Sequence, residues 1–132
     1  MARWKIKNVG MKGVAMAVPE NVVKTSDFDF FSQEEAEVFD NTVGIRRRHI
    51  APDNMCASDM CQAAAEKLLE ELGWERDSID VLLFESVTGD YRTPPTSCIL
   101  QDRLALSENC FCMDIPMGCC GCMYAKIGRA SC

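Results

Sequence analysis

The stretch Asp114-Ile-Pro-Met-Gly-Cys-Cys-Gly-Cys-Met-Tyr124 decides how this sequence is interpreted. It continues an apolar segment that is typical of a buried strand, and a helical pattern begins at Gly121. Cys119 is therefore expected in a strand-to-helix turn. Because a helix N-terminus carries unpaired N–H groups and a partial positive charge, it stabilises a thiolate over a thiol. Cys119 is a candidate nucleophile, although most single cysteines are buried and inert.

Strand and helix patterns alternate outward from this turn. Apolar and β-branched runs bounded by turn residues predict strands at 4–18, 81–87 and 110–115. Helices are expected at 32–39, at 58–72, from 95 to about 106, and after Cys119. This alternation is typical of an α/β fold with a parallel sheet. Ligands of such sheets gather at the carboxyl ends of the strands, and Cys119 is expected at one of these ends.

Local signals define the ends of the predicted helices. Ser32 and Glu35 form a possible capping box for the first helix. Ser58 is the N-cap candidate of the second helix, and Gly73 supplies its stop. Pro95 is expected at the first position of the third helix. The strand that begins at Val81 is expected to be buried on both faces because it starts with an unbroken apolar run.

Composition limits the class of protein. With 132 residues, 48% apolar and 26% charged, the chain is expected to form one globular domain. Its net charge of −6 argues against a nucleic-acid partner, because phosphates would be repelled. The sequence has neither an apolar run long enough to cross a membrane nor an N-terminal signal pattern. We therefore expect a cytoplasmic protein without membrane contact.

Nine cysteines require an explanation. A disulfide framework belongs to small secreted chains, so reduced thiols are expected here. Metal binding is the main alternative, because five cysteines lie between 110 and 122. Zinc and iron–sulfur sites favour paired C-x2-C knuckles, whereas Cys110 and Cys112 share one strand face and Cys119 and Cys120 are adjacent. We expect no metal, and keep a cysteine-cluster metal-binding or redox module as the alternative of another class.

Several ordered motifs together resemble the N-terminal part of the β-ketoacyl-acyl-carrier-protein (ACP) synthase III family. The resemblance covers 5–124, and its motifs are Val18-Pro-Glu-Asn-Val-Val23, the run 43–51, Ala57-Ser-Asp-Met60, Ser78-Ile-Asp80, Pro94 with Gln101, and Asp-x4-Cys-x-Gly at 114–121. It implies an α/β, thiolase-like fold of layered αβαβα type. Only the N-terminal half of that fold is expected, ending just after the nucleophile turn. We assign 1–125 to this domain.

The resemblance also implies a function. Cys119 matches the cysteine that takes an acyl group from acyl-CoA, and the acyl-enzyme then reacts with malonyl-ACP in a decarboxylative Claisen condensation of fatty acid biosynthesis. Acyl-CoA is a substrate, no cofactor is expected, and the full-length family forms homodimers. Cys120 and Cys122 match positions without a catalytic role. The family's catalytic His and Asn lie downstream of the nucleophile and are missing here, so this chain is expected to be inactive in condensation.

Substrate contacts are expected at three positions. Arg46 belongs to an Arg run that could hold coenzyme A phosphates, although such a run is more often a solvated face. Thr93 and Pro94 match a loop that reaches toward the acyl pocket of the partner subunit. Val38 replaces a Trp that commonly stacks on the coenzyme A adenine, and Thr42 replaces a common nearby Arg. A related condensing enzyme of secondary metabolism, with another acyl donor, is therefore a second hypothesis.

The final residues, 126–132, do not resemble the family. The stretch Lys126-Ile-Gly-Arg-Ala-Ser-Cys132 resembles the translation of a sequencing adaptor, so we interpret it as a non-native tail and exclude it from the fold. A third hypothesis is that the polypeptide as written has no activity. Without the second half of the fold, much of the apolar surface of its sheet would be uncovered.

Overall fold

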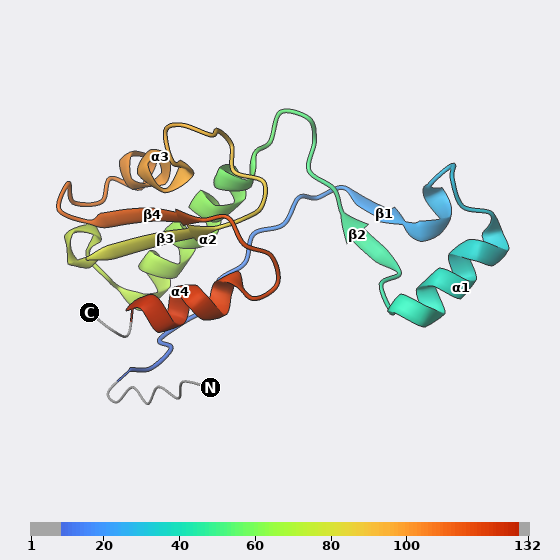
Figure 1. The fold of residues 1–132 in the computed structure, drawn as a ribbon, viewed down its shortest axis with the longest axis horizontal. Helices are drawn as coiled ribbons and strands as arrows, with labels where there is room; N and C mark the ends of the chain where they lie inside the picture. Colours follow the sequence, from blue (N-terminus) through green and yellow to red (C-terminus); the bar gives the residue numbers. More distant parts are fainter. Residues whose placement is uncertain (1–8, 130–132) are drawn as a thin grey trace. The chain divides into compact units, whose positions relative to one another are not determined.

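The computed structural model describes residues 9–129, which form two compact units (Figure 1). The small unit is the segment 18–56. The large unit contains the described residues that precede Val18 and follow Cys56. The single domain expected for 1–125 thus consists of two units.

The small unit is a two-stranded sheet with one helix. Strand β1 (Val22–Lys24) pairs antiparallel with β2 (Arg47–His49), a short 3-10 turn follows β1 at Thr25–Asp27, and helix α1 spans Gln33–Val43. The capping box is confirmed, because Ser32 Oγ accepts from the Glu35 N–H and the Glu35 carboxylate accepts from the Ser32 N–H. The helix runs past Phe39 and ends at Gly44, whose φ of 77° suits glycine.

The large unit contains two parallel strands and three helices among its described residues. In chain order they are α2 (Ala57–Leu72), a 3-10 turn (Arg76–Ser78), β3 (Val81–Glu85), α3 (Thr96–Arg103), β4 (Phe111–Ile115) and α4 (Gly121–Arg129). Strands β3 and β4 pair in parallel, in register from Val81↔Phe111 to Glu85↔Ile115. Helix α3 lies on one side of these strands and α4 on the other (Figure 1). The expected layered α/β architecture is confirmed.

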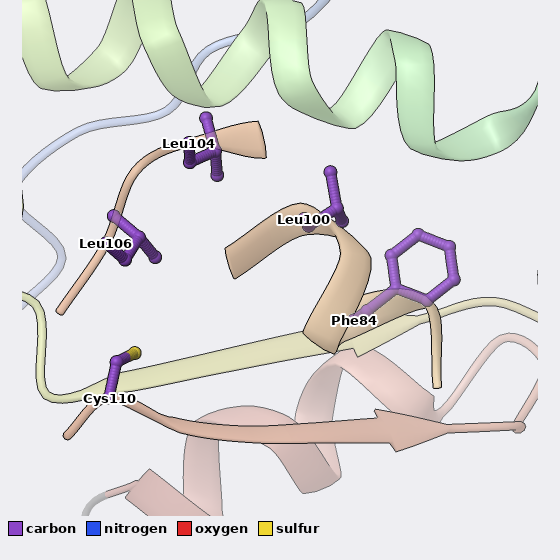
Figure 2. Packing of buried hydrophobic residues seen from close by; sticks show 5 residues of the cluster. All are labelled: Phe84, Leu100, Leu104, Leu106 and Cys110. Carbon is purple, nitrogen blue, oxygen red and sulfur yellow. The ribbon is translucent and has the colours of Figure 1, made fainter. Parts of the chain in front are cut away.

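A small apolar core holds the large unit together. Its buried side chains lie between the strands and helix α2 (Figure 2), and they are Phe84, Leu100, Leu104, Leu106 and Cys110. Leu104 is 2% exposed, and burying a leucine contributes about 1.5–3 kcal/mol. The strand beginning at Val81 was expected to be buried on both faces, but only Phe84 is fully buried in it. That prediction is wrong for the rest of β3, whose remaining side chains are only half-buried by the two flanking helices.

The N-terminal segment corrects a second prediction. Residues 9–18 contain no strand, and the remainder of the predicted strand, 4–8, lies outside the described residues. Gly13 lies against α2, where an added Cβ would come 2.7 Å from the Leu68 Cδ1 atom. The larger Val14 and Met16 are 74% and 79% exposed. A β-branched, apolar pattern forms a strand only when a neighbouring strand satisfies its backbone, and the described residues provide none here.

The start of α2 corrects a third prediction. The helix begins at Ala57, so Ser58 is inside the first turn and is not its N-cap. Ser58 is fully buried, and its N–H donates to Asp90 Oδ1 at 3.4 Å while its hydroxyl donates to Asp90 Oδ2. A carboxylate from a distant loop therefore satisfies the first turn of α2. The predicted stop at Gly73 is confirmed by its φ of 61°.

Helix α3 is capped from the end of β4. Pro95 is its N-cap, one position before the predicted one, and contributes no side-chain hydrogen bond. The N–H groups of Thr96 and Ser97 instead donate to the two carboxylate oxygens of Asp114, each at 2.8 Å. Partial burial alone would raise the pKa of Asp114, but the hydrogen bonds from Ser97 and Thr96 outweigh it and lower that pKa below its usual value.

Helix α4 packs against β3 through a glycine. An added Cβ at Gly121 would come 2.5 Å from the Glu85 Cγ atom, closer than real Cβ contacts allow. Glu85 is the last residue of β3, and its half-buried side chain therefore occupies the space beside the first turn of α4. The two elements approach closely because position 121 has no side chain.

We expect Asp114→Asn to lower the free energy of unfolding by about 1–3 kcal/mol, because one amide oxygen cannot replace two charged acceptors. The lowered pKa of Asp114 means that its stabilisation is present above about pH 3.9, the ordinary Asp pKa, and is lost as the pH falls through the lower folded value. Urea unfolding at pH 7 and at successively lower pH measures the difference. The control is Asp102→Asn, an exposed carboxylate of α3, and equal effects of the two substitutions would contradict the capping role.

We expect Gly121→Ala to destabilise the protein by about 1 kcal/mol, because the new Cβ displaces the Glu85 side chain from its half-buried place. In a Glu85→Ala background the same substitution is expected to stabilise by a few tenths of a kcal/mol or more, because alanine is the better helix former. Thermal unfolding of the four proteins in this cycle measures the change of sign. An effect of Gly121→Ala that is the same in both backgrounds would disprove the contact.

Candidate functional site

The carboxyl ends of β3 and β4 define one edge of the large unit. Because the strands are parallel and Glu85 is opposite Ile115, the loop 86–95 and the turn 116–120 leave the sheet at the same edge. Ligands of parallel sheets bind at such an edge. The structure therefore brings together the two segments in which the sequence placed Cys119, Thr93 and Pro94.

Cys119 lies in the predicted strand-to-helix turn. The Gly121 N–H donates to the Gly118 carbonyl at 2.8 Å, which closes the turn around Cys119. The Cys120 carbonyl then accepts from the N–H groups of Met123 and Tyr124, so α4 begins directly after the turn. The Cys119 side chain is exposed. The strand-to-helix placement is confirmed, and the catalytic role of this thiol stays a prediction.

The cysteines near Cys119 differ in how far they are exposed to solvent. Cys110 is buried in the core and Cys112 is half-buried on the same strand face, as expected. Burial, assisted by the adjacent Cys110, raises the pKa of Cys112 to about 11, so this thiol stays protonated at neutral pH. Cys119, Cys120 and Cys122 are all exposed. Of the five thiols between positions 110 and 122, a substrate can therefore reach the three in the segment 119–122 most easily.

Two carboxylates lie at the ends of the two strands. Asp114, at the end of β4, accepts from backbone N–H groups at the start of α3. Glu85, at the end of β3, was missed by sequence reasoning, although it lies against Gly121, between Cys120 and Cys122 in the chain. A negative charge is favourable beside the N-terminus of a helix. The available signal was a glutamate at the end of an apolar strand.

The remaining predicted contacts are exposed in the structure. Thr93 and Pro94 lie in the loop 86–95, and the peptide bond between them is cis. Arg46 belongs to the small unit, where it lines a shallow pocket with acidic side chains of α1 that include Glu37 and Asp40. No role of Arg46, Thr93 or Pro94 is tested by this geometry.

The phenylalanines of the small unit form one cluster of tilted rings. Neighbouring rings have centroids 4.8–5.3 Å apart, and the cluster consists of Phe28, Phe30, Phe31 and Phe39. The Arg48 guanidinium lies over the Phe39 ring, 5.3 Å from its centroid. Two of these rings, with Val38 and Thr42, line an apolar groove along α1. This groove contains the positions at which the chain departs from the family pattern.

Within residues 9–129, no three His, Cys, Asp or Glu side chains are grouped so that they could hold a metal ion. Over the same residues, none of the helices combines the length and apolarity that crossing a membrane requires.

Known proteins resemble this chain in sequence. No family model matches it. A β-ketoacyl-ACP synthase III of Clostridium perfringens is 35% identical over 126 residues, which are 95% of this chain and 38% of that protein. A β-ketoacyl-ACP synthase III of Geobacillus kaustophilus is 36% identical over 121 residues, 92% of this chain and 39% of that protein. The chain thus spans little more than a third of the length of the curated relatives it matches.

Solved structures agree with these relatives. A 3-oxoacyl-ACP synthase of Burkholderia xenovorans superposes with a TM-score of 0.82 at 36% identity, over 91% of this chain and 36% of that one. OleA of Xanthomonas campestris superposes with a TM-score of 0.84 over 96% of this chain and 39% of that one, and at 22% identity it supports the fold alone. The chain is therefore homologous, over nearly its whole length, to β-ketoacyl-ACP synthase III, and it has the fold of the N-terminal part of these thiolase-fold enzymes.

Proposed function

We propose that Cys119 is the acyl-accepting nucleophile of a β-ketoacyl-ACP synthase III. The observation that carries this proposal is the exposed Cys119 thiol in the turn between β4 and α4, in a chain homologous to that family. In the proposed reaction the Cys119 thiolate attacks the carbonyl carbon of acyl-CoA. Coenzyme A leaves as its thiolate, and the acyl group remains on Cys119 as a thioester. No resident cofactor takes part.

The second half of the proposed reaction joins the acyl group to malonyl-ACP. Decarboxylation of the malonyl group produces a carbanion, which attacks the thioester carbonyl on Cys119 and forms a β-ketoacyl product. In the family a histidine and an asparagine downstream of the nucleophile support this step. The single histidine of this sequence, His49, is far upstream of Cys119. We therefore assign only the acylation step to the residues of this chain. Condensation is expected only in a protein in which a downstream histidine and asparagine complete the site.

Substrate contacts and assembly belong to the same proposal. The loop 86–95 leaves the sheet at the edge that holds Cys119, which supports a role of Thr93 and Pro94 beside the acyl group. We assign Arg46 to the coenzyme A phosphates on the resemblance alone. A homodimer in the cytoplasm is expected for the complete enzyme.

A related condensing enzyme with a different acyl donor is the second candidate. The observation that favours it is the groove along α1, where Val38 replaces the Trp that commonly stacks on the adenine and Thr42 replaces a common nearby Arg. Neither side chain can stack on a purine or donate a charged hydrogen bond. The choice between the two candidates is therefore a question of which acyl donor transfers its acyl group to Cys119.

We expect incubation of the protein with acyl-CoA to place one acyl group on Cys119. Acetyl-CoA, isobutyryl-CoA and a longer acyl-CoA are compared, because transfer from short donors supports fatty acid initiation and transfer from only a long donor supports the second candidate. Cleavage at Asp114 and Lys126 gives a peptide whose only cysteines are Cys119, Cys120 and Cys122. Mass spectrometry of this peptide locates the acyl group.

The matched variants are Cys119→Ala, which should abolish labelling, and Cys120→Ala, which should retain it because the adjacent exposed thiol has no assigned role. Labelling that persists in Cys119→Ala, or that is lost equally in both variants, would contradict the assignment.

The metal-binding alternative predicts stoichiometric zinc or iron in the purified protein. We expect elemental analysis to find neither, and a chelator to leave the thermal unfolding midpoint unchanged, because a structural metal would contribute directly to folding. One bound metal ion per chain, removed together with stability by the chelator, would favour the metal-binding module over acyl transfer.

A further inference from the structure

We propose that Cys119 and Cys122 form a reversible intrachain disulfide, so that the candidate nucleophile is also a redox modification site. The pair is a C-x-x-C sequence at the start of a helix, Cys119-Cys-Gly-Cys122. Thiols in this arrangement are reactive because the helix N-terminus favours the thiolate. Disulfide formation does not depend on acyl transfer.

Backbone hydrogen bonds form a tight turn around the two cysteines. The Gly121 N–H bonds to the Gly118 carbonyl, and the Met123 N–H bonds to the Cys120 carbonyl at 3.0 Å. Both are bonds between residues three apart, as in a 3-10 turn, in which the side chains at i and i+3 eclipse. Cys119 and Cys122 are also three residues apart in this turn, which is the spacing that such a turn brings to one side of the backbone.

Cys120 is a poorer partner, although it is equally exposed. Cα atoms of adjacent residues are about 3.8 Å apart, below the usual disulfide range of about 4.4–6.8 Å. At a rise of about 2.0 Å per residue, residues three apart in a 3-10 turn have Cα atoms about 6 Å apart, which lies within that range. Gly121 lies between the two cysteines and adds no Cβ that would obstruct this closure.

The thiols of β4 do not compete for Cys119. Cys110 is buried in the core, and the raised pKa of Cys112 keeps that thiol protonated. A small oxidant in solution therefore reaches the turn before it reaches the strand. Among the exposed thiols, Cys122 is the one nearest to Cys119 in sequence after the adjacent Cys120.

The oxidant in the proposed step is a small-molecule disulfide. The Cys119 thiolate attacks one of its sulfur atoms and releases one thiolate, which leaves a mixed disulfide on Cys119. Cys122 then loses its proton to solvent, attacks the Cys119 sulfur and releases the second thiolate. Two cysteine thiols are thereby oxidised by two electrons, and the small disulfide is reduced to two thiols. A dithiol reductant reverses both steps.

The disulfide would close the acyl-accepting site. A Cys119 sulfur bonded to Cys122 has no lone thiolate with which to attack acyl-CoA, so oxidation blocks acylation and reduction restores it. This consequence rests on the proposed function, whereas formation of the disulfide can be tested without any acyl donor.

The experiment treats the reduced protein with oxidised glutathione, blocks the remaining thiols with N-ethylmaleimide and cleaves at Asp114 and Lys126. We expect the wild-type peptide to carry the disulfide and a single maleimide, on Cys120. Cys120→Ser is the matched control and should keep the disulfide without any maleimide. Cys122→Ser should lose the disulfide and hold glutathione on Cys119. Dithiothreitol should return the wild-type peptide to its fully reduced form.

A wild-type peptide with three maleimides, with a lasting glutathione adduct, or with a disulfide that survives in Cys122→Ser would overturn the proposal. Acyl labelling of the same samples separates the two hypotheses. If the disulfide forms but the reduced protein takes up no acyl group, the proposed function is wrong and the disulfide proposal is supported. If the reduced protein is acylated and no disulfide forms, the proposed function is supported and the disulfide proposal is wrong.

Discussion

The carboxylate of Asp114 accepts the N–H groups of both Thr96 and Ser97, and the edge of the sheet that holds Cys119 depends on this pair of hydrogen bonds. They join the end of β4 to the start of α3, across residues that are far apart in sequence. Thr96 and Ser97 are fully buried, so water cannot replace Asp114 as the acceptor. The loop before α3 and the turn after β4 are therefore held at the same edge, where parallel sheets bind their ligands.

The distribution of the cysteines follows from the same arrangement. Cys110, directly before β4, is buried in the core, and Cys112, two residues later in the strand, is half-buried with a raised pKa, whereas the turn after the strand leaves Cys119 exposed. Glu85 reaches the same turn from β3 and occupies the space that Gly121 leaves open. Exposure alone does not distinguish Cys119 from Cys120 and Cys122, which are also exposed, so the choice of Cys119 rests on the family resemblance.

Local signals predicted well wherever the responsible interactions are local. The capping box of Ser32 and Glu35 and the left-handed stop at Gly73 need only a few neighbouring residues, and both are present. Ser58 failed as an N-cap because Asp90, which lies in a loop far along the chain, satisfies the first turn of α2. The strand expected at 4–18 failed over its described part because strand pairing is not a local property.

The sequence by itself determined the α/β alternation, the strand-to-helix turn at Cys119 and the family resemblance. Periodicity, turn residues and ordered motifs can be recognised from residues that are close together in the sequence. Only the tertiary structure decided which carboxylates serve which helices, how deeply each cysteine is buried, and that Glu85 lies beside Gly121. These features depend on distances between residues that are remote in sequence. Such distances are set by the packing of α2, α3 and α4 on the two parallel strands, and no local pattern encodes them.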